Sequence, residues 1–79
     1  MDDIRARLEN CFAAVFPTLS AGEIAQADHY SVSAWDSVAS VTLFATIEEE
    51  FGLELEIADL PELVSFEKIA AYLTSKVTA

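Results

Sequence analysis

The sequence predicts an all-α fold, a small bundle of three main helices and one short helix, with a long loop between the first and second helices. Three longer segments carry apolar residues at helical spacing. One stretch, 53–57, alternates like a strand but has no second strand to pair with. Cys11 and His29 are the only cysteine and histidine, so neither a disulfide nor a cysteine–histidine metal site can brace these 79 residues. Packed helices remain as the source of a core.

The first predicted helix ends near Phe16, because Pro17 cannot continue it. Its apolar face consists of Ile4, Leu8, Cys11, Phe12 and Val15. We expect Cys11 to be a buried small hydrophobe rather than a nucleophile.

A long loop is predicted from Pro17 to Trp35, where the apolar spacing becomes irregular and polar residues increase. Loops this long are often functional in small domains. Five apolar residues are expected to pin it across the helices: Leu19, Ile24, Tyr30, Val32 and Trp35. His29 lies here without the serine–acid arrangement of a catalytic histidine.

The second helix should begin at Asp36 or Ser37 and stop at Phe51, with Gly52 as its C-terminal cap. Its apolar positions are Val38, Val41, Leu43, Phe44, Ala45, Ile47 and Phe51. They cover well over half of the helical circumference, more than a helix packed on one side requires. Part of this surface should therefore meet something besides its own core.

Residues 53–57 are interpreted as an extended connector that leads to a short helical turn around 59–63. Asp59 and Glu62 have capping-box spacing, and Pro61 is tolerated in a first turn.

Ser65 then caps the last helix, and Lys76 lies favourably near its end. The apolar face of this helix consists of Phe66, Ile69, Ala70, Leu73 and Val77. We expect residues 1–79 to form a single domain and a monomer.

The formal net charge is −10, from 14 acidic and 4 basic residues. This charge argues against binding to nucleic acid or an anionic membrane and favours basic patches on partner proteins. We find no signal-peptide pattern and no apolar run of about 20 residues that could span a bilayer. The acidic residues also lack the spacing of a calcium loop. We therefore expect a cytoplasmic protein that binds no metal.

The run Trp35-Asp36-Ser37-Val38 places a serine at the start of the most apolar predicted helix. A hydroxyl at this position can be exposed, and a phosphodiester on it would gain from the positive end of the helix dipole. Asp36 can help a modifying enzyme to hold its metal ion. An Asp-Ser dipeptide alone is usually only a helix cap, but this setting suits covalent attachment better than catalysis.

Residues 36–51, DSVASVTLFATIEEEF, resemble acyl carrier proteins and related thiolation domains, whose signature is Asp-Ser-Leu before an apolar helix that ends in Glu-Glu-x-Phe. The match continues without a gap through 53–55 to 71–73. It implies that a phosphopantetheinyl transferase moves 4′-phosphopantetheine from coenzyme A onto Ser37. It also implies that the thiol of this arm carries acyl or aminoacyl groups as thioesters between acyl-loading and acyl-processing enzymes, and that the chain itself is not an enzyme.

Two residues of the motif depart from the family pattern. Val38 replaces the usual leucine of the transferase recognition motif, which is a conservative change. Trp35 stands where a small residue is common. Tryptophan there also occurs in many stand-alone carriers, which favours a discrete protein.

The resemblance makes Glu48 and Glu49 docking contacts for basic patches on partner enzymes. Carriers often also place carboxylates early in this helix, where this chain has Ala39 and Thr42. The surface near Ser37 is thus less acidic, which disfavours pairing with ordinary fatty-acid enzymes. Val38 and Ala45 either supply the apolar part of the interface or belong to the core.

The alternatives to an acyl carrier are a small acidic helical adaptor, in which Asp36-Ser37 is only a cap, and an aminoacyl or peptidyl carrier. Fatty-acid, polyketide, aminoacyl and specialised-lipid pathways all stay open. The sequence also leaves open whether the larger phenylalanines fill the core or leave a slot for an acyl chain; these are Phe12, Phe44, Phe51 and Phe66.

Overall fold

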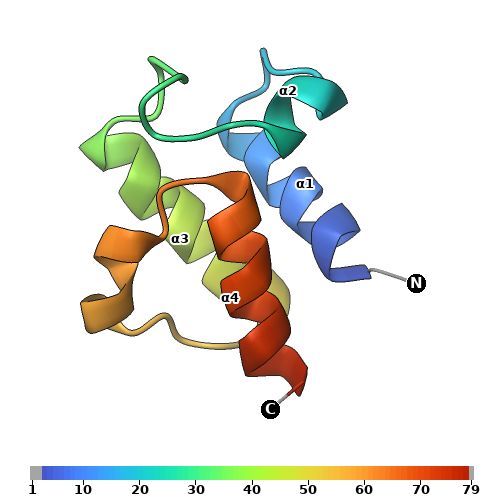
Figure 1. The fold of residues 1–79 in the computed structure, drawn as a ribbon, viewed down its shortest axis with the longest axis vertical. Helices are drawn as coiled ribbons and strands as arrows, with labels where there is room; N and C mark the ends of the chain where they lie inside the picture. The colour runs from blue at the N-terminus through green and yellow to red at the C-terminus, as the bar shows by residue number, and fades with distance from the viewer. Residues whose placement is uncertain (1–2, 79) are drawn as a thin grey trace.

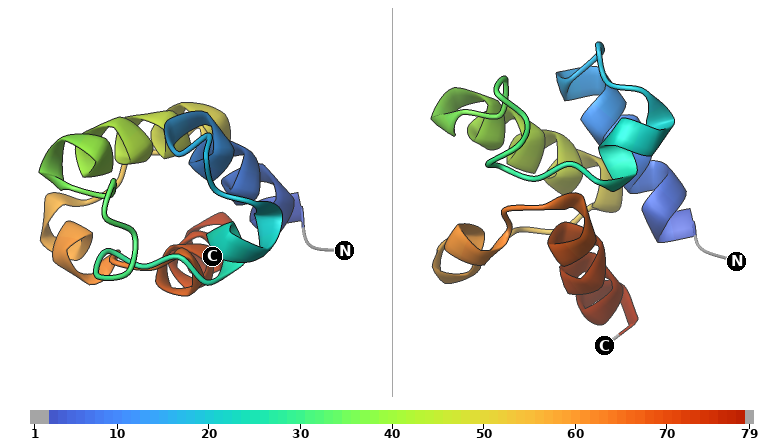
Figure 2. Two further views of the ribbon diagram at one scale, coloured as in Figure 1. Left: turned by 90° about the horizontal axis from the view of Figure 1, so that it is seen from above. Right: turned by 45° about the horizontal axis from the view of Figure 1, so that its top comes forward.

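The computed structural model describes residues 3–78, which form four α-helices and one 3₁₀-helix and contain no strand. In chain order the elements are α1 (Asp3–Val15), α2 (Ala21–Ala25), α3 (Ser37–Phe51), η1 (Ile57–Glu62) and α4 (Phe66–Thr78) (Figure 1). Viewed from above, α1 and α3 lie on one side of the molecule, and η1 and α4 lie on the other (Figure 2). The predicted all-α fold is confirmed, including the three main helices.

The core forms where the apolar faces of α1, α3 and α4 meet. Each predicted face supplies buried residues: Leu8, Cys11 and Phe12 from α1, Leu43 and Ile47 from α3, and Phe66, Ile69, Ala70 and Leu73 from α4. Phe12 lies at the centre, with its ring edge-on to Trp35 at 5.4 Å and to Phe66 at 5.3 Å. Such aromatic pairs contribute about 0.5–1.5 kcal/mol beyond the area that they bury.

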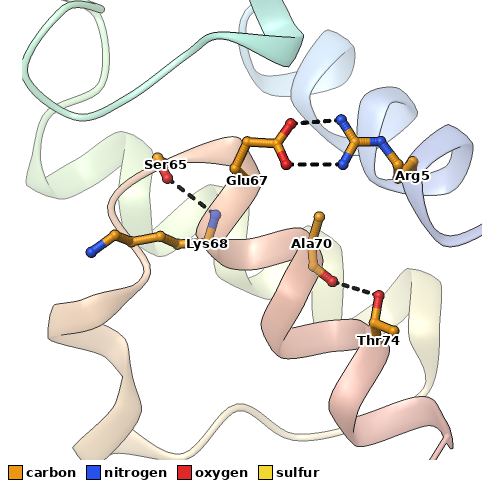
Figure 3. A network of polar contacts seen from close by, with 6 residues as sticks. All are labelled: Arg5, Ser65, Glu67, Lys68, Ala70 and Thr74. Atoms are coloured by element: carbon orange, nitrogen blue, oxygen red, sulfur yellow. Dashed lines mark hydrogen bonds and ion pairs between the residues drawn. The ribbon is translucent and has the colours of Figure 1, made fainter.

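Two arginines tie α1 to its neighbours. Arg5 forms a two-pronged ion pair with Glu67 at the start of α4, with N–O distances of 3.1 and 2.7 Å (Figure 3). This contact holds the pKa of the Glu67 carboxyl below its usual range. Arg7 pairs with the Glu50 carboxylate at 2.8 Å and lies over the Phe51 ring at the end of α3. Exposed ion pairs contribute little by themselves, so the packing of the arginine side chains matters as much as their charge.

The predicted long loop contains a short helix that the sequence analysis did not identify. Helix α2 begins with a capping box, in which Ser20 Oγ accepts from the Glu23 N–H at 3.2 Å and Glu23 Oε1 accepts from the Ser20 N–H at 2.8 Å. The Ser-x-x-Glu spacing was present in the sequence. Five residues are too few to show a helical period, so the cap was the only signal.

The loop residues expected to pin the chain are mostly confirmed. Ile24 and Trp35 are buried, and Leu19 and Val32 pack against the core. The prediction for Tyr30 was wrong, because its side chain is 84% exposed.

The short helical turn begins earlier than predicted, at Ile57. Its N-cap residue is Glu56, which makes no side-chain capping bond, so the proposed capping box of Asp59 and Glu62 was wrong. The Asp59 carboxylate instead accepts a hydrogen bond from the Tyr72 hydroxyl of α4 at 3.0 Å. Asp59 was predicted from local spacing to cap the helix, but its carboxylate instead binds Tyr72, which lies in another segment.

The predicted start of the last helix is confirmed. Ser65 Oγ accepts a hydrogen bond from the Lys68 N–H at 3.1 Å (Figure 3). Lys76 lies in the last turn. Val77 is the exception on the apolar face, because it is about half exposed.

Candidate functional site

Ser37 is the first residue of α3 and its side chain is exposed. Asp36 precedes it in an extended conformation and caps the helix, with Oδ1 accepting from the Ala39 N–H at 2.8 Å. The first turn of α3 contains no acidic residue. An anionic group on the Ser37 hydroxyl would therefore sit at the positive end of a 15-residue helix without a carboxylate in that turn.

Trp35 fixes the chain just before this serine. Its indole is 2% exposed and packs edge-on against Phe12. The indole Nε1–H donates to Ser40 Oγ at 2.8 Å, one turn into α3. The residue expected only to pin the loop therefore also holds the segment that presents Ser37.

The loop is joined to the start of α4 on the opposite side of the site. The His29 N–H donates to the Val64 carbonyl at 2.7 Å, and the Phe66 N–H donates to the Ala27 carbonyl at 2.9 Å. Between them, Asp28 Oδ1 accepts from the N–H groups of Tyr30 and Ser31 at 2.8 and 2.7 Å. These hydrogen bonds, led by the one from Ser31, hold the pKa of the Asp28 carboxyl below its usual range.

An apolar groove runs from Ser37 along the space between α3 and η1. Its first cavity, of about 390 Å³, opens beside Ser37; its residues are His29, Trp35, Ser37, Ser40, Phe44, Ile57, Leu60, Pro61, Leu63 and Val64. A second cavity of about 260 Å³ continues past Phe44 towards Leu55. Phe12 and Phe66 are fully buried, whereas Phe44 is half-buried and lines both cavities. Phe12 and Phe66 thus fill the core, whereas Phe44 borders an open groove at the surface.

The outer face of α3 beside this groove is apolar and exposed. Val38 is 75% exposed and Val41 70%, and Ala45 is also exposed. Ile57, on the η1 side of the groove, is 85% exposed. These side chains do not belong to the core, which resolves the question left open for Val38 and Ala45. The over-wide apolar surface predicted for this helix exists and faces solvent.

The three glutamates at the end of α3 have different surroundings. The Glu48 carboxylate is half-buried and accepts from the Leu55 N–H at 2.8 Å, so it holds the connector that follows the helix. Glu49 is exposed and makes no hydrogen bond or ion pair within residues 3–78. Glu50 pairs with Arg7. Among the three, Glu49 alone has a carboxylate that the fold itself does not use.

No catalytic or metal centre is found elsewhere in the described part of the chain. Cys11 is buried as expected, and burial raises the pKa of its thiol to about 11, with a further contribution from Glu50. In residues 3–78 no group of three His, Cys, Asp or Glu side chains could hold a metal ion. Within the same range, no helix has the length and apolarity needed to cross a bilayer.

Two side chains of this site were not predicted from the sequence. Ser40 was not named as a site residue, and His29 was considered only for catalysis. Both line the cavity beside Ser37. The position of Ser40 one turn after Asp36 was a usable signal, but the approach of His29 depends on how the loop folds back.

A family model described as "Phosphopantetheine attachment site" matches residues 6–73. This range includes α2, α3 and η1 in full and most of α1 and α4. Searches of curated proteins and of solved structures returned no match.

Proposed function

The chain belongs to the phosphopantetheine attachment family, whose members are non-catalytic carriers with a covalently bound 4′-phosphopantetheine, and we propose that Ser37 is the attachment residue. The observation that carries this proposal is the exposed hydroxyl at the first position of α3, which has a capped helix N-terminus behind it and a cavity beside it. The residues present fit the group: Ser37 offers the hydroxyl, and the helix start offers dipole stabilisation to a phosphodiester. When bound, the arm supplies a thiol that forms thioesters.

The fold contributes to this function by presenting Ser37 to the modifying enzyme. The bond between Trp35 and Ser40 and the Asp36 cap keep Ser37 at a defined place for a phosphopantetheinyl transferase. The exposed Val38 gives that enzyme an apolar contact next to the serine. The Asp36 carboxylate is adjacent and can assist the metal ion of the transferase. We propose residues 1–79 as a single carrier domain.

The cargo that fits best is an acyl group. The groove between α3 and η1 is lined mostly by apolar side chains, so it favours a hydrocarbon chain over a charged aminoacyl group. This groove supports the acyl carrier over the aminoacyl or peptidyl alternative. The pathway, whether fatty-acid, polyketide or specialised-lipid synthesis, is not distinguished by a groove of this kind.

Partner enzymes are proposed to dock on α3 next to Ser37. Val38 and Ala45 provide an exposed apolar strip, and Glu49 provides a free carboxylate at its far end. Glu48 is a weaker docking candidate than expected, because its carboxylate holds the connector. A partner with basic residues around an apolar centre would fit this surface, and the negative net charge would speed the encounter.

The test of the attachment site is an intact mass after incubation with coenzyme A and a broad-specificity phosphopantetheinyl transferase. We expect the mass to rise by one phosphopantetheine group. The Ser37→Ala variant should gain nothing, whereas Ser33→Ala, a matched change of an exposed serine in the preceding loop, should be modified normally. A protein that stays unmodified, or an adduct that survives Ser37→Ala, would refute the proposal.

The cargo is tested with the same transferase and coenzyme A thioesters of graded chain length. If an acyl chain enters the groove, the melting temperature should rise with chain length until the groove is full. An aminoacyl arm should leave the melting temperature close to that of the unacylated form. Equal melting temperatures for all cargoes would argue against an acyl group held in the groove.

A further inference from the structure

The cavity beside Ser37 has one ionisable residue in its wall, His29. We propose that the His29 imidazole binds the phosphodiester that joins the arm to Ser37, as a cation that forms a charge-assisted hydrogen bond with a phosphate oxygen. This inference rests on the proposed attachment at Ser37. It assigns to His29 a positioning function, which is to hold the base of the arm against the loop.

His29 is held beside the cavity by one backbone hydrogen bond and by a ring contact with Trp35. Its backbone N–H is bound to the Val64 carbonyl at 2.7 Å, which fixes the loop next to the start of α4. Its ring contacts the Trp35 ring edge-on, with centroids 6.4 Å apart and an interplanar angle of 90°. Trp35 is itself buried and lies two residues before Ser37. Both His29 and Ser37 then line the same cavity of about 390 Å³.

The other basic residues are engaged elsewhere. Arg5 and Arg7 pair with carboxylates at the start of α4 and the end of α3. Lys76 lies over the Tyr72 ring in the last turn of α4, and Lys68 lines a cavity on another side of η1. Among the described residues that line the cavity beside Ser37, His29 is thus the only one able to carry a positive charge.

The charged groups around His29 leave room for this role. Asp28 is adjacent and its negative charge interacts with His29, while its Oδ1 atom accepts from two backbone N–H groups of the loop. Asp36 is committed to the cap of α3. The ring of Tyr30 stands edge-on to that of His29, with centroids 5.4 Å apart. The η1 side contributes only apolar residues to this cavity.

A phosphodiester keeps one negative charge throughout the range in which an imidazole titrates. A protonated imidazole offers two N–H donors, and its hydrogen bond to a phosphate is about twice as strong as a neutral one. The phosphate therefore stabilises the protonated ring, and the protonated ring holds the phosphate. The arm should therefore be restrained at its base when the imidazole is protonated and released when it is neutral.

The experiment follows the His29 ring protons by NMR between about pH 5 and pH 8.5, before and after modification. Attachment at Ser37 should move the midpoint of the ring-proton shifts to higher pH, because the negative phosphate stabilises the protonated ring. The ³¹P signal of the holo protein should titrate with the same midpoint, because the phosphodiester does not itself titrate in this range. In His29→Gln the ³¹P signal should stay constant.

A control is supplied by Gln26→His, which places a second imidazole at the end of α2, in the wall of a different cavity. Its midpoint should be the same in the apo and holo forms. The comparison of apo and holo wild-type protein needs no variant, so it stands even if a substitution disturbs the fold. A holo protein with a confirmed Ser37 adduct, an unmoved His29 midpoint and a flat ³¹P signal would overturn this inference and leave the attachment site intact. A missing adduct would instead refute the proposed function.

Discussion

The Trp35 indole Nε1–H and Ser40 Oγ form a hydrogen bond of 2.8 Å that bridges the start of α3. Asp36 and Ser37 lie between its two ends. One end is anchored in the core, because Trp35 is 2% exposed and packs against Phe12 and Phe16. The other end belongs to the first turns of the helix. This contact couples the position of the attachment residue to the packing of the whole bundle.

Replacement of Ser40 by alanine should therefore destabilise the protein. It leaves the indole N–H of Trp35 without its partner, and an unsatisfied buried donor costs about 1–3 kcal/mol. We expect about 1 kcal/mol, because the adjacent cavity can admit water to the indole. Urea denaturation followed by the fluorescence of Trp35 measures this loss.

The matched control is Ser33→Ala, since Ser33 is exposed. It should change the free energy of unfolding by no more than about 0.5 kcal/mol. Trp35→Phe combined with Ser40→Ala gives a double-mutant cycle, which is followed by far-UV circular dichroism because two of its variants lack the Trp35 fluorophore. A coupling energy of zero would show that the bond contributes nothing.

The two glycines should respond in opposite ways to substitution by alanine. Gly52 caps α3 with φ of 64°, a conformation that costs a side-chain-bearing residue about 1–2 kcal/mol. Gly22 lies within α2 without a positive φ, so alanine there should stabilise by about 0.4–1 kcal/mol. A Cβ at either position would meet nothing within 4 Å, so the two effects isolate backbone preference. Thermal denaturation should place Gly52→Ala below the wild type and Gly22→Ala above it, and the same order for both would contradict the assigned conformations.

The buried thiol of Cys11 should make stability depend on pH in the alkaline range. Burial raises the pKa of Cys11 from 9.0 to about 11 in the folded state, so the folded chain holds this proton more tightly than the unfolded chain. The stabilisation is complete below pH 9.0 and is lost as the pH rises towards about 11. The slope of the free energy of unfolding should approach about 1.4 kcal/mol per pH unit from this residue alone.

Cys11→Ala isolates this effect, because it removes the thiol and no other titratable group. The variant should be less stable near neutrality, owing to the lost packing, and the gap should narrow above pH 9.0. Parallel stability curves between about pH 8 and about pH 11 would show that the thiol keeps its ordinary pKa.

The elements that were predicted well are those specified by local signals that agree. Helix α3 was placed to within one residue at its start and correctly at its end, because Asp36 caps it, an apolar run fills it and Gly52 ends it. Helix α2 was missed because five residues carry no period, although the Ser20–Glu23 spacing indicated a cap.

The rest depended on contacts between distant segments. The capping box predicted for Asp59 was wrong because Tyr72, 13 residues later, binds that carboxylate. The serine of the candidate site could be proposed from the sequence, since its helix start is local. The cavity beside it could not, because its walls come from α3, η1 and two loop segments that only the fold brings together.

Glu48 and Glu49 should respond differently to neutralisation, although they are neighbours in the sequence. Glu48→Gln replaces the charged acceptor of the Leu55 N–H with a neutral amide oxygen. The weaker hydrogen bond should lower the free energy of unfolding by about 1 kcal/mol. Glu49→Gln changes an exposed carboxylate and should leave the free energy of unfolding within about 0.5 kcal/mol of the wild type.

If Glu49 contributes to docking, its neutralisation should lower kcat/KM for a partner with a basic docking patch by about two- to threefold at low ionic strength. The effect should vanish at high salt, where exposed charges are screened. The second variant thus separates docking from folding: a Glu49→Gln protein with unchanged kcat/KM at low salt would remove this carboxylate from the docking surface and leave the apolar strip of Val38 and Ala45 to account for partner binding.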